Sequence, residues 1–221
     1  MTVSNITKII ITPVLALSAF IFTSNAYRQQ KEERYIFFLH DRFLETHELG
    51  EPHPQFGLAG YKNILREFEK SELKVISEKR NENVNALEYA QGIVKQIDSL
   101  TAFGIPPNKI TVVGTSKGGY IAQYVSTLAN NPQLNFVFIA CFQNNDIQNI
   151  PDINYCGNIL TIFEKSDTYG VSAIDRKNSS TCDIVNFKEI ELNTEMGHGF
   201  LFQPLEEWIT PTIKWAKGNY D

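Results

Sequence analysis

The chain has 221 residues, enough for one domain with a sizeable core and too few for two comfortable ones. Hydrophobic residues make up 43% and charged residues 20%, ordinary values for a folded soluble protein. The formal net charge of −5 and the scattered Lys and Arg argue against a nucleic-acid-binding surface, which needs basic clusters.

The N-terminal segment has the pattern of a secretory signal peptide. Lys8 precedes an apolar stretch over residues 9–22, and Ser24-Asn25-Ala26 provides a small-x-small cleavage site. The alternative is an uncleaved anchor, but the stretch is shorter than the roughly 20 residues of a membrane span, and Pro13 interrupts it. We therefore expect cleavage after Ala26 and an exported protein, periplasmic or secreted, with no membrane attachment after cleavage.

The remaining chain, residues 27–221, alternates apolar strands with amphipathic helices. Residues 35–40 form a continuous apolar run, typical of a strand buried on both faces. Further strands are predicted at residues 73–77, 109–113, 135–140, 159–163 and 184–192, the last nearer a sheet edge. Helical spacing predicts helices over residues 61–68, 87–100 and 120–128 and from Pro204 onward, with Pro211 kinking or splitting the last. This order predicts one α/β domain with a parallel sheet of about six strands between helices.

A Gly-rich turn joins the strand at 109–113 to the next helix. It reads Gly114-Thr115-Ser116-Lys117-Gly118-Gly119, a G-x-S-x-G match in a strand–turn–helix context. Such a turn raises the serine hydroxyl above the sheet, and the flanking glycines avoid collisions with neighbouring backbone. The order of Lys117 and the glycines does not fit a phosphate-binding P-loop, and a dinucleotide-binding G-x-G-x-x-G is absent.

On these residues the chain resembles a compact, exported member of the α/β-hydrolase superfamily whose nucleophile motif reads Gly-x-Ser-Lys-Gly. The resemblance covers residues 35–215 and implies a three-layer α/β/α sandwich with a Ser–acid–His triad in that chain order. Ser116 is then the nucleophile, Asp167 the acid and His198 the base. Glu164 and Asp175 are rival acids. His40, His47 and His53 all precede the serine and break the expected order.

The resemblance also implies two backbone amides that stabilise a developing oxyanion. One belongs to Lys117, after the nucleophile, and the segment His40-Asp41-Arg42 provides the other, for which we take the Arg42 amide. Asp41 departs from the family, which usually has Gly there. Its carboxylate would be unfavourable near an oxyanion unless it points away or pairs with Arg42, and His40 could be only a structural residue.

No large lid is predicted. The connection at residues 141–158 has no helical apolar stripe, and the loop at 41–60 is the only other segment able to overhang Ser116, with prolines and charges that suggest a polar rim. We therefore expect a shallow site for small carboxylic esters, with no cofactor and no metal. Acyl transfer, peptidase action and a non-catalytic exported binding protein are the alternatives.

The three cysteines lack CxxC spacing and clustered His, so a structural zinc site is not expected. In the resembled fold, the strands after Cys156 and Cys182 are parallel neighbours, which implies a disulfide between these two residues and a free Cys141. Three free thiols remain the alternative.

Overall fold

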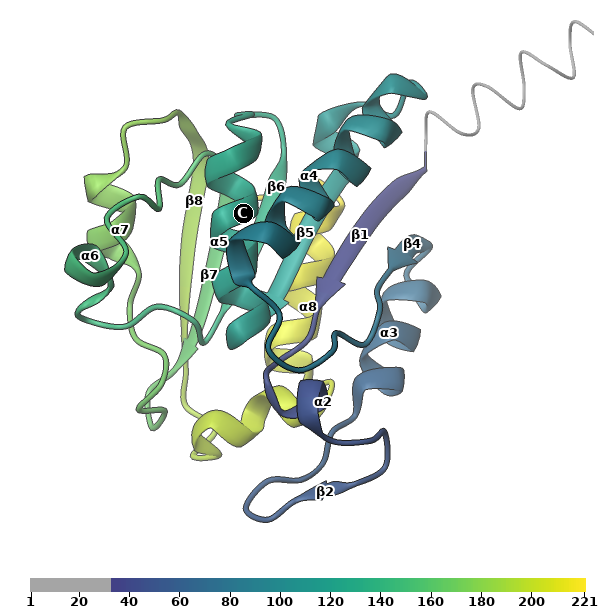
Figure 1. The fold of residues 1–221 in the computed structure, drawn as a ribbon, viewed down its shortest axis with the longest axis vertical. Coiled ribbons are helices and arrows are strands. Elements are labelled where there is room, and N and C mark those ends of the chain that lie inside the picture. Colours follow the sequence, from purple (N-terminus) through teal and green to yellow (C-terminus); the bar gives the residue numbers. More distant parts are fainter. Residues whose placement is uncertain (1–32) are drawn as a thin grey trace, which may run out of the picture. The chain divides into compact units, whose positions relative to one another are not determined.

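A computed structural model describes residues 33–221. The predicted signal peptide lies outside the described residues. Six strands form one sheet in the order β4-β1-β5-β6-β7-β8, and every neighbouring pair is parallel (Figure 1). The strands are β1 (Arg34–Leu39), β4 (Leu73–Ile76), β5 (Ile110–Thr115), β6 (Asn135–Ile139), β7 (Gly157–Glu164) and β8 (Ile184–Leu192). A separate two-stranded hairpin pairs β2 (Pro52–His53) with β3 (Gly57–Leu58).

Helices cover both faces of the sheet. The longer ones are α3 (Tyr61–Lys70), α4 (Ala86–Ala102), α5 (Lys117–Ala129) and α8 (Glu206–Ala216). The short ones are α2 (Phe43–Thr46), α6 (Asp146–Asn149), α7 (Ile174–Ser179) and the 3₁₀ helices η1 (Pro107–Lys109) and η2 (Gly197–Phe202). The apolar residues of α3 and α8 pack in one core cluster, and those of α4 and α5 pack in another. The three-layer α/β/α sandwich predicted from the sequence is confirmed.

Strand β1 shows why its buried part, from Ile36 to Leu39, is apolar at every position. Ile36 and Phe38 belong to the cluster with α3 and α8, whereas Phe37 and Leu39 belong to the cluster with α4 and α5. All four side chains are at most 2% exposed. Successive side chains of a strand point to opposite faces, so a strand covered by helices on both sides must be apolar at every position.

The last helix corrects one expectation. Pro211 lies inside α8, which continues on both sides of it as one helix. The missing proline amide removes one backbone hydrogen bond, but Trp208 and Trp215, each at most 1% exposed, hold the two halves against the same core. Of the two expected effects of Pro211, a kink or a split, the split is therefore wrong, because tertiary packing outweighs the local break.

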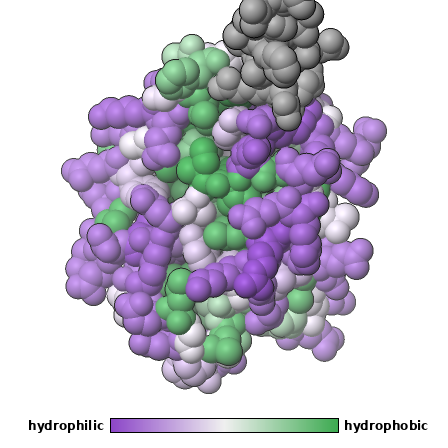
Figure 2. Space-filling model, turned by 90° about the vertical axis from the view of Figure 1, so that its right-hand side faces the viewer, coloured by the Kyte–Doolittle hydropathy of each residue, from purple (hydrophilic) through white to green (hydrophobic). Residues whose placement is uncertain are grey.

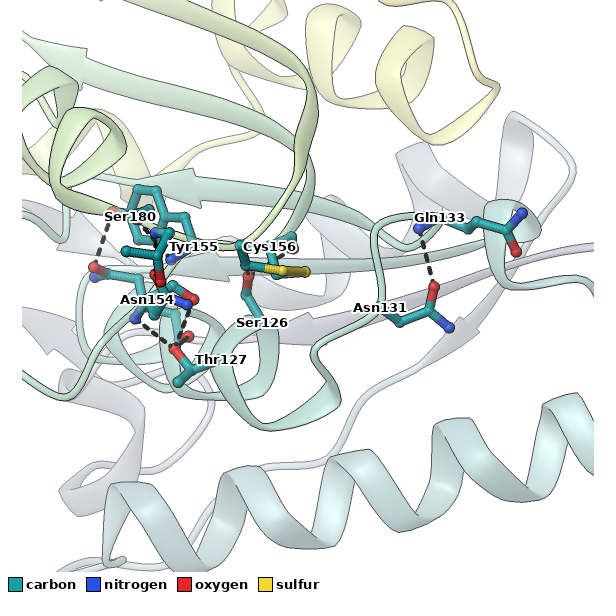
Figure 3. Close-up of a disulfide and its surroundings, with 11 residues drawn as sticks. Ser126, Thr127, Asn131, Gln133, Asn154, Tyr155, Cys156 and Ser180 are labelled. Atoms are coloured by element: carbon teal, nitrogen blue, oxygen red, sulfur yellow. Dashed lines mark hydrogen bonds between the residues drawn. A yellow bond between two sulfur atoms is a disulfide. The ribbon is translucent and has the colours of Figure 1, made fainter.

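A disulfide joins Cys156 to Cys182 across a separation of 26 residues, and Cys141 is free. The bond links the segments that enter β7 and β8, which are adjacent in the sheet. Ser126, on α5, donates its hydroxyl to the Cys156 carbonyl at 2.8 Å and accepts the Cys156 amide at 2.9 Å (Figure 3). The start of β7 is thus fixed to both β8 and α5.

On the side of the molecule shown in Figure 2, hydrophilic residues cover most of the surface, and hydrophobic residues show in a central area and in smaller patches. Within residues 33–221, no helix has the length and apolarity needed to cross a membrane.

Candidate active site

The site begins at Ser116, between β5 and α5. Its backbone has φ 50° and ψ −119°, a conformation that a non-glycine residue adopts only under constraint. The Ser116 amide donates to the Ile139 carbonyl at 2.9 Å, which anchors the turn to β6. A Cβ atom at Gly118 would overlap the Leu39 carbonyl of β1, so this position requires glycine. The strand, sharp turn and helix predicted from the sequence are all present.

His198 and Asp167 lie beside the serine. His198 Nε2 is 2.9 Å from Ser116 Oγ, and His198 Nδ1 is 2.6 Å from Asp167 Oδ2. An ionised carboxylate only accepts hydrogen bonds, so Nδ1 carries the proton and Nε2 is free to accept the serine hydroxyl. Asp167 also accepts the Tyr169 amide at 2.8 Å, and its side chain is fully buried. The structure therefore brings together the three residues that the sequence selected.

The rival acids lie elsewhere. Glu164, fully buried at the end of β7, accepts hydrogen bonds from the amides and hydroxyls of Ser166 and Thr194. Burial raises the pKa of Glu164, but these hydrogen bonds outweigh it and leave the pKa below its ordinary value. Glu164 thus joins the loops that carry Asp167 and His198. Asp175 is exposed on α7.

Asp41 borders a cavity at Ser116, and its carboxylate is hydrogen-bonded to the start of α2, which it caps. Its Oδ1 accepts the Phe43 amide at 2.8 Å, and the Leu44 amide also bonds to it. Burial raises the pKa of Asp41, although these hydrogen bonds oppose the rise. Among residues 33–221, no ion pair joins Asp41 to Arg42. The Asp41 carboxylate thus binds the amides of Phe43 and Leu44. The preceding amide, that of Arg42, has no hydrogen-bond partner in the described chain. The Lys117 amide is likewise unpartnered there, and both residues border a cavity at Ser116.

A buried ionic cluster that sequence reasoning missed lies behind these two amides. Glu45, on α2, accepts Arg80 Nε at 2.9 Å and Lys117 Nζ at 2.5 Å. The Arg80 side chain is fully buried, and its Nη2 donates to the carbonyls of His40 and Asp41. Glu45 therefore connects the two chain segments that carry the Arg42 and Lys117 amides. No local pattern marks Arg80, because its partners are 35 to 40 residues away.

His40 is a structural residue in this cluster. Its Nε2 accepts the Arg80 amide at 2.8 Å, and its Nδ1 donates to the Asp41 carbonyl at 2.6 Å. Burial, together with the positive charge of Arg80, lowers the pKa of His40 to about 3. The imidazole is therefore neutral at physiological pH and holds the loop in shape.

Two cavities open beside Ser116. The larger, about 500 Å³, has a wall of aromatic rings in mutual contact, which we call the aromatic wall. Its members are Phe43, His47, His53, Phe56 and Phe202, of which all but His47 line the cavity. The loop at 41–60 lines this cavity beside the serine with both kinds of side chain. Asp41, Arg42, Thr46 and Gln55 contribute polar groups, as the sequence suggested, and the rings of Phe43, His53 and Phe56 add an aromatic surface that it did not indicate.

The smaller cavity, about 390 Å³, is lined by both polar and apolar residues. It lies toward α6 and includes Lys117, Gln143, Asp146 and Asn149. Within residues 33–221, no group of three or more His, Cys, Asp or Glu side chains is arranged to hold a metal ion.

The fold matches that of several solved structures. An esterase/lipase from an uncultured bacterium superposes with a TM-score of 0.60 at 12% identity, covering 86% of this chain and 78% of that chain. An α/β-hydrolase enzyme from a Medee basin deep-sea metagenome library gives 0.57 at 11% identity, covering 89% and 88%. SOBER1 of Arabidopsis thaliana gives 0.53 at 16% identity, covering 86% and 100%. No protein-family model and no curated protein matches the sequence. The chain therefore has the α/β-hydrolase fold.

Proposed function

We propose that this protein is a serine hydrolase acting on small carboxylic esters, with Ser116, His198 and Asp167 as its catalytic triad. The observation that carries the proposal is the continuous hydrogen-bonded chain from Ser116 Oγ through the His198 ring to the buried Asp167. A nucleophile hydrogen-bonded to a base, itself oriented by a third group, is the arrangement that activates a serine hydroxyl.

The reaction follows from these positions. Ser116 Oγ attacks the ester carbonyl carbon while His198 Nε2 takes the hydroxyl proton. The bond to the alcohol oxygen breaks, and His198 returns the proton to the departing alcohol, which leaves an acyl group on Ser116. Water then attacks the acyl-enzyme with His198 again as base, and the acid and free serine are regenerated. Asp167 stabilises the imidazolium form of His198 in both the acylation and the deacylation step.

The amides of Arg42 and Lys117 are the proposed oxyanion donors. Both are unpartnered within the described chain and both residues border the serine. The ion pairs from Glu45 to Arg80 and Lys117 hold their segments in place before substrate binds. Donors fixed in advance stabilise the developing charge without reorganisation.

We also propose that the protein is exported. The N-terminal pattern of a signal peptide and the Cys156–Cys182 disulfide both fit an oxidising compartment, periplasmic or extracellular. The match to esterase structures supports hydrolase chemistry in general.

Labelling with a fluorophosphonate probe, followed by turnover of short-chain p-nitrophenyl esters, tests the proposal. The wild-type protein should label and hydrolyse, Ser116→Ala should do neither, and Ser99→Ala, an exposed serine on α4, should behave as wild type. Asp167→Asn should keep the fold and lower kcat by about 10³- to 10⁴-fold, because an amide favours the wrong imidazole tautomer. Labelling of the Ser116→Ala variant would overturn the assignment.

A further inference from the structure

The two cavities meet at the proposed nucleophile. Ser116, Arg42 and Tyr169 line both of them. A substrate bound with its carbonyl carbon at Ser116 Oγ therefore extends one part into each cavity. The two parts of an ester, acyl and alcohol, then meet different surroundings.

His198 determines which part enters which cavity. The departing alcohol oxygen must receive its proton from His198 Nε2, so the alcohol must lie on the histidine side of the serine. His198 lines the larger cavity, whereas the smaller one is bordered by Lys117 and not by His198. The alcohol part thus occupies the larger cavity and the acyl part the smaller one.

The larger cavity is suited to a flat ring. His53 stacks on Phe56 with ring centroids 4.4 Å apart and an angle of 11° between their planes, and Phe202 packs on both. The His53 ring is held there because its Nδ1 accepts the amides of Gln55 and Phe56. Such pre-positioned rings offer faces and edges to another aromatic ring at little conformational cost.

From these contacts we propose that the preferred substrate is an ester of an aromatic alcohol with a small acyl group. This inference rests on the proposed function and specifies the substrate class. The smaller cavity accommodates the acyl part, where the exposed side chains of Gln143 and Asn149 offer amide groups for hydrogen bonds.

Matched esters test the orientation. Benzyl acetate and cyclohexylmethyl acetate release alcohols of similar size, and neither alcohol is activated, so their kcat/KM ratio reports recognition of the ring. We expect a preference for benzyl acetate of about 3- to 10-fold, the range of an aromatic pair contact. Ethyl phenylacetate and ethyl cyclohexylacetate place the same rings on the acyl side, and their ratio should be close to one.

A variant of the aromatic wall tests whether these rings cause the preference for benzyl acetate. Phe56→Leu keeps an apolar side chain but removes a ring of the aromatic wall, so the benzyl preference should fall toward one. Phe103→Leu, 71% exposed after α4, makes the same chemical change outside the site and should keep the preference. A second measurement needs no variant. The inhibition constants of the two product alcohols, benzyl alcohol and cyclohexylmethanol, are compared on the wild-type protein, and benzyl alcohol should bind more tightly.

The outcomes separate this inference from the proposed function. Failure to hydrolyse any ester, with no probe labelling, would refute the proposed function. Ester hydrolysis with equal rates for the benzyl and cyclohexylmethyl acetates would overturn the aromatic-alcohol inference alone. A ring preference on the acyl side would show that the substrate binds in the opposite orientation.

Discussion

His40 makes the folded protein sensitive to acid through a measurable mechanism. The folded state holds the pKa of His40 at about 3, because of burial and the nearby positive charge of Arg80, whereas an unfolded histidine has a pKa near 6.5. Between these values the unfolded chain binds a proton that the folded chain does not. The free energy of unfolding therefore falls as pH decreases below about 6.5.

The size of this pH effect on the free energy of unfolding depends mainly on the pKa of His40 in the unfolded chain. Lowering the pH from 7.5 to 5.0 costs about 2 kcal/mol through His40 alone, for any folded pKa below about 4. Urea denaturation of the wild-type protein and of His40→Asn at both pH values, at constant ionic strength, measures this contribution. Asn can keep the donor to the Asp41 carbonyl and does not titrate.

The variant should be less stable at pH 7.5, because it leaves the Arg80 amide unpartnered. Its loss of unfolding free energy on acidification should nevertheless be smaller than that of the wild type by about 2 kcal/mol. His40→Gln, which can accept the Arg80 amide but loses the donor, should show the same reduced dependence on pH. Equal losses in wild type and variants would refute the reasoning, since they would mean that His40 is not held neutral.

Three further predictions concern stability. Gly118→Ala should prevent correct folding of the nucleophile turn, lowering Tm and abolishing probe labelling, whereas Gly92→Ala on α4, where a Cβ meets nothing within 4 Å, should leave both intact. Replacing Cys156 and Cys182 by Ser should lower the free energy of unfolding by about 3.5 kcal/mol in the chain-entropy model for this loop; non-reducing peptide mapping that finds both thiols free in the wild type would contradict it. Phe68→Ala should cost about 3 to 5 kcal/mol in urea denaturation, because its fully buried ring contacts Phe38 and Trp208, and a cost below 1 kcal/mol would refute that packing.

The sequence by itself determined the features that arise from local pattern. Continuous apolar runs such as 35–40 indicated strands buried on both faces, because only a helix-covered sheet leaves no polar side to a strand. The turn at Ser116 could be predicted from the sequence because its geometry depends on adjacent glycines. Asp167 and His198 were assigned from the resemblance to the α/β-hydrolase superfamily, whose triad has the chain order Ser, acid, His.

Only the tertiary structure decided which distant groups meet. Asp41 stands where glycine was expected because it caps α2 and exposes the Arg42 amide, a role that depends on where its carboxylate points. Glu45 and Lys117 are 72 residues apart, and their ion pair exists because the sheet places α2 beside the start of α5. The aromatic wall likewise joins Phe202, near the C-terminus, to a loop before α3. Side-chain direction and long-range proximity are set by packing of the whole chain, and no local pattern carries that information.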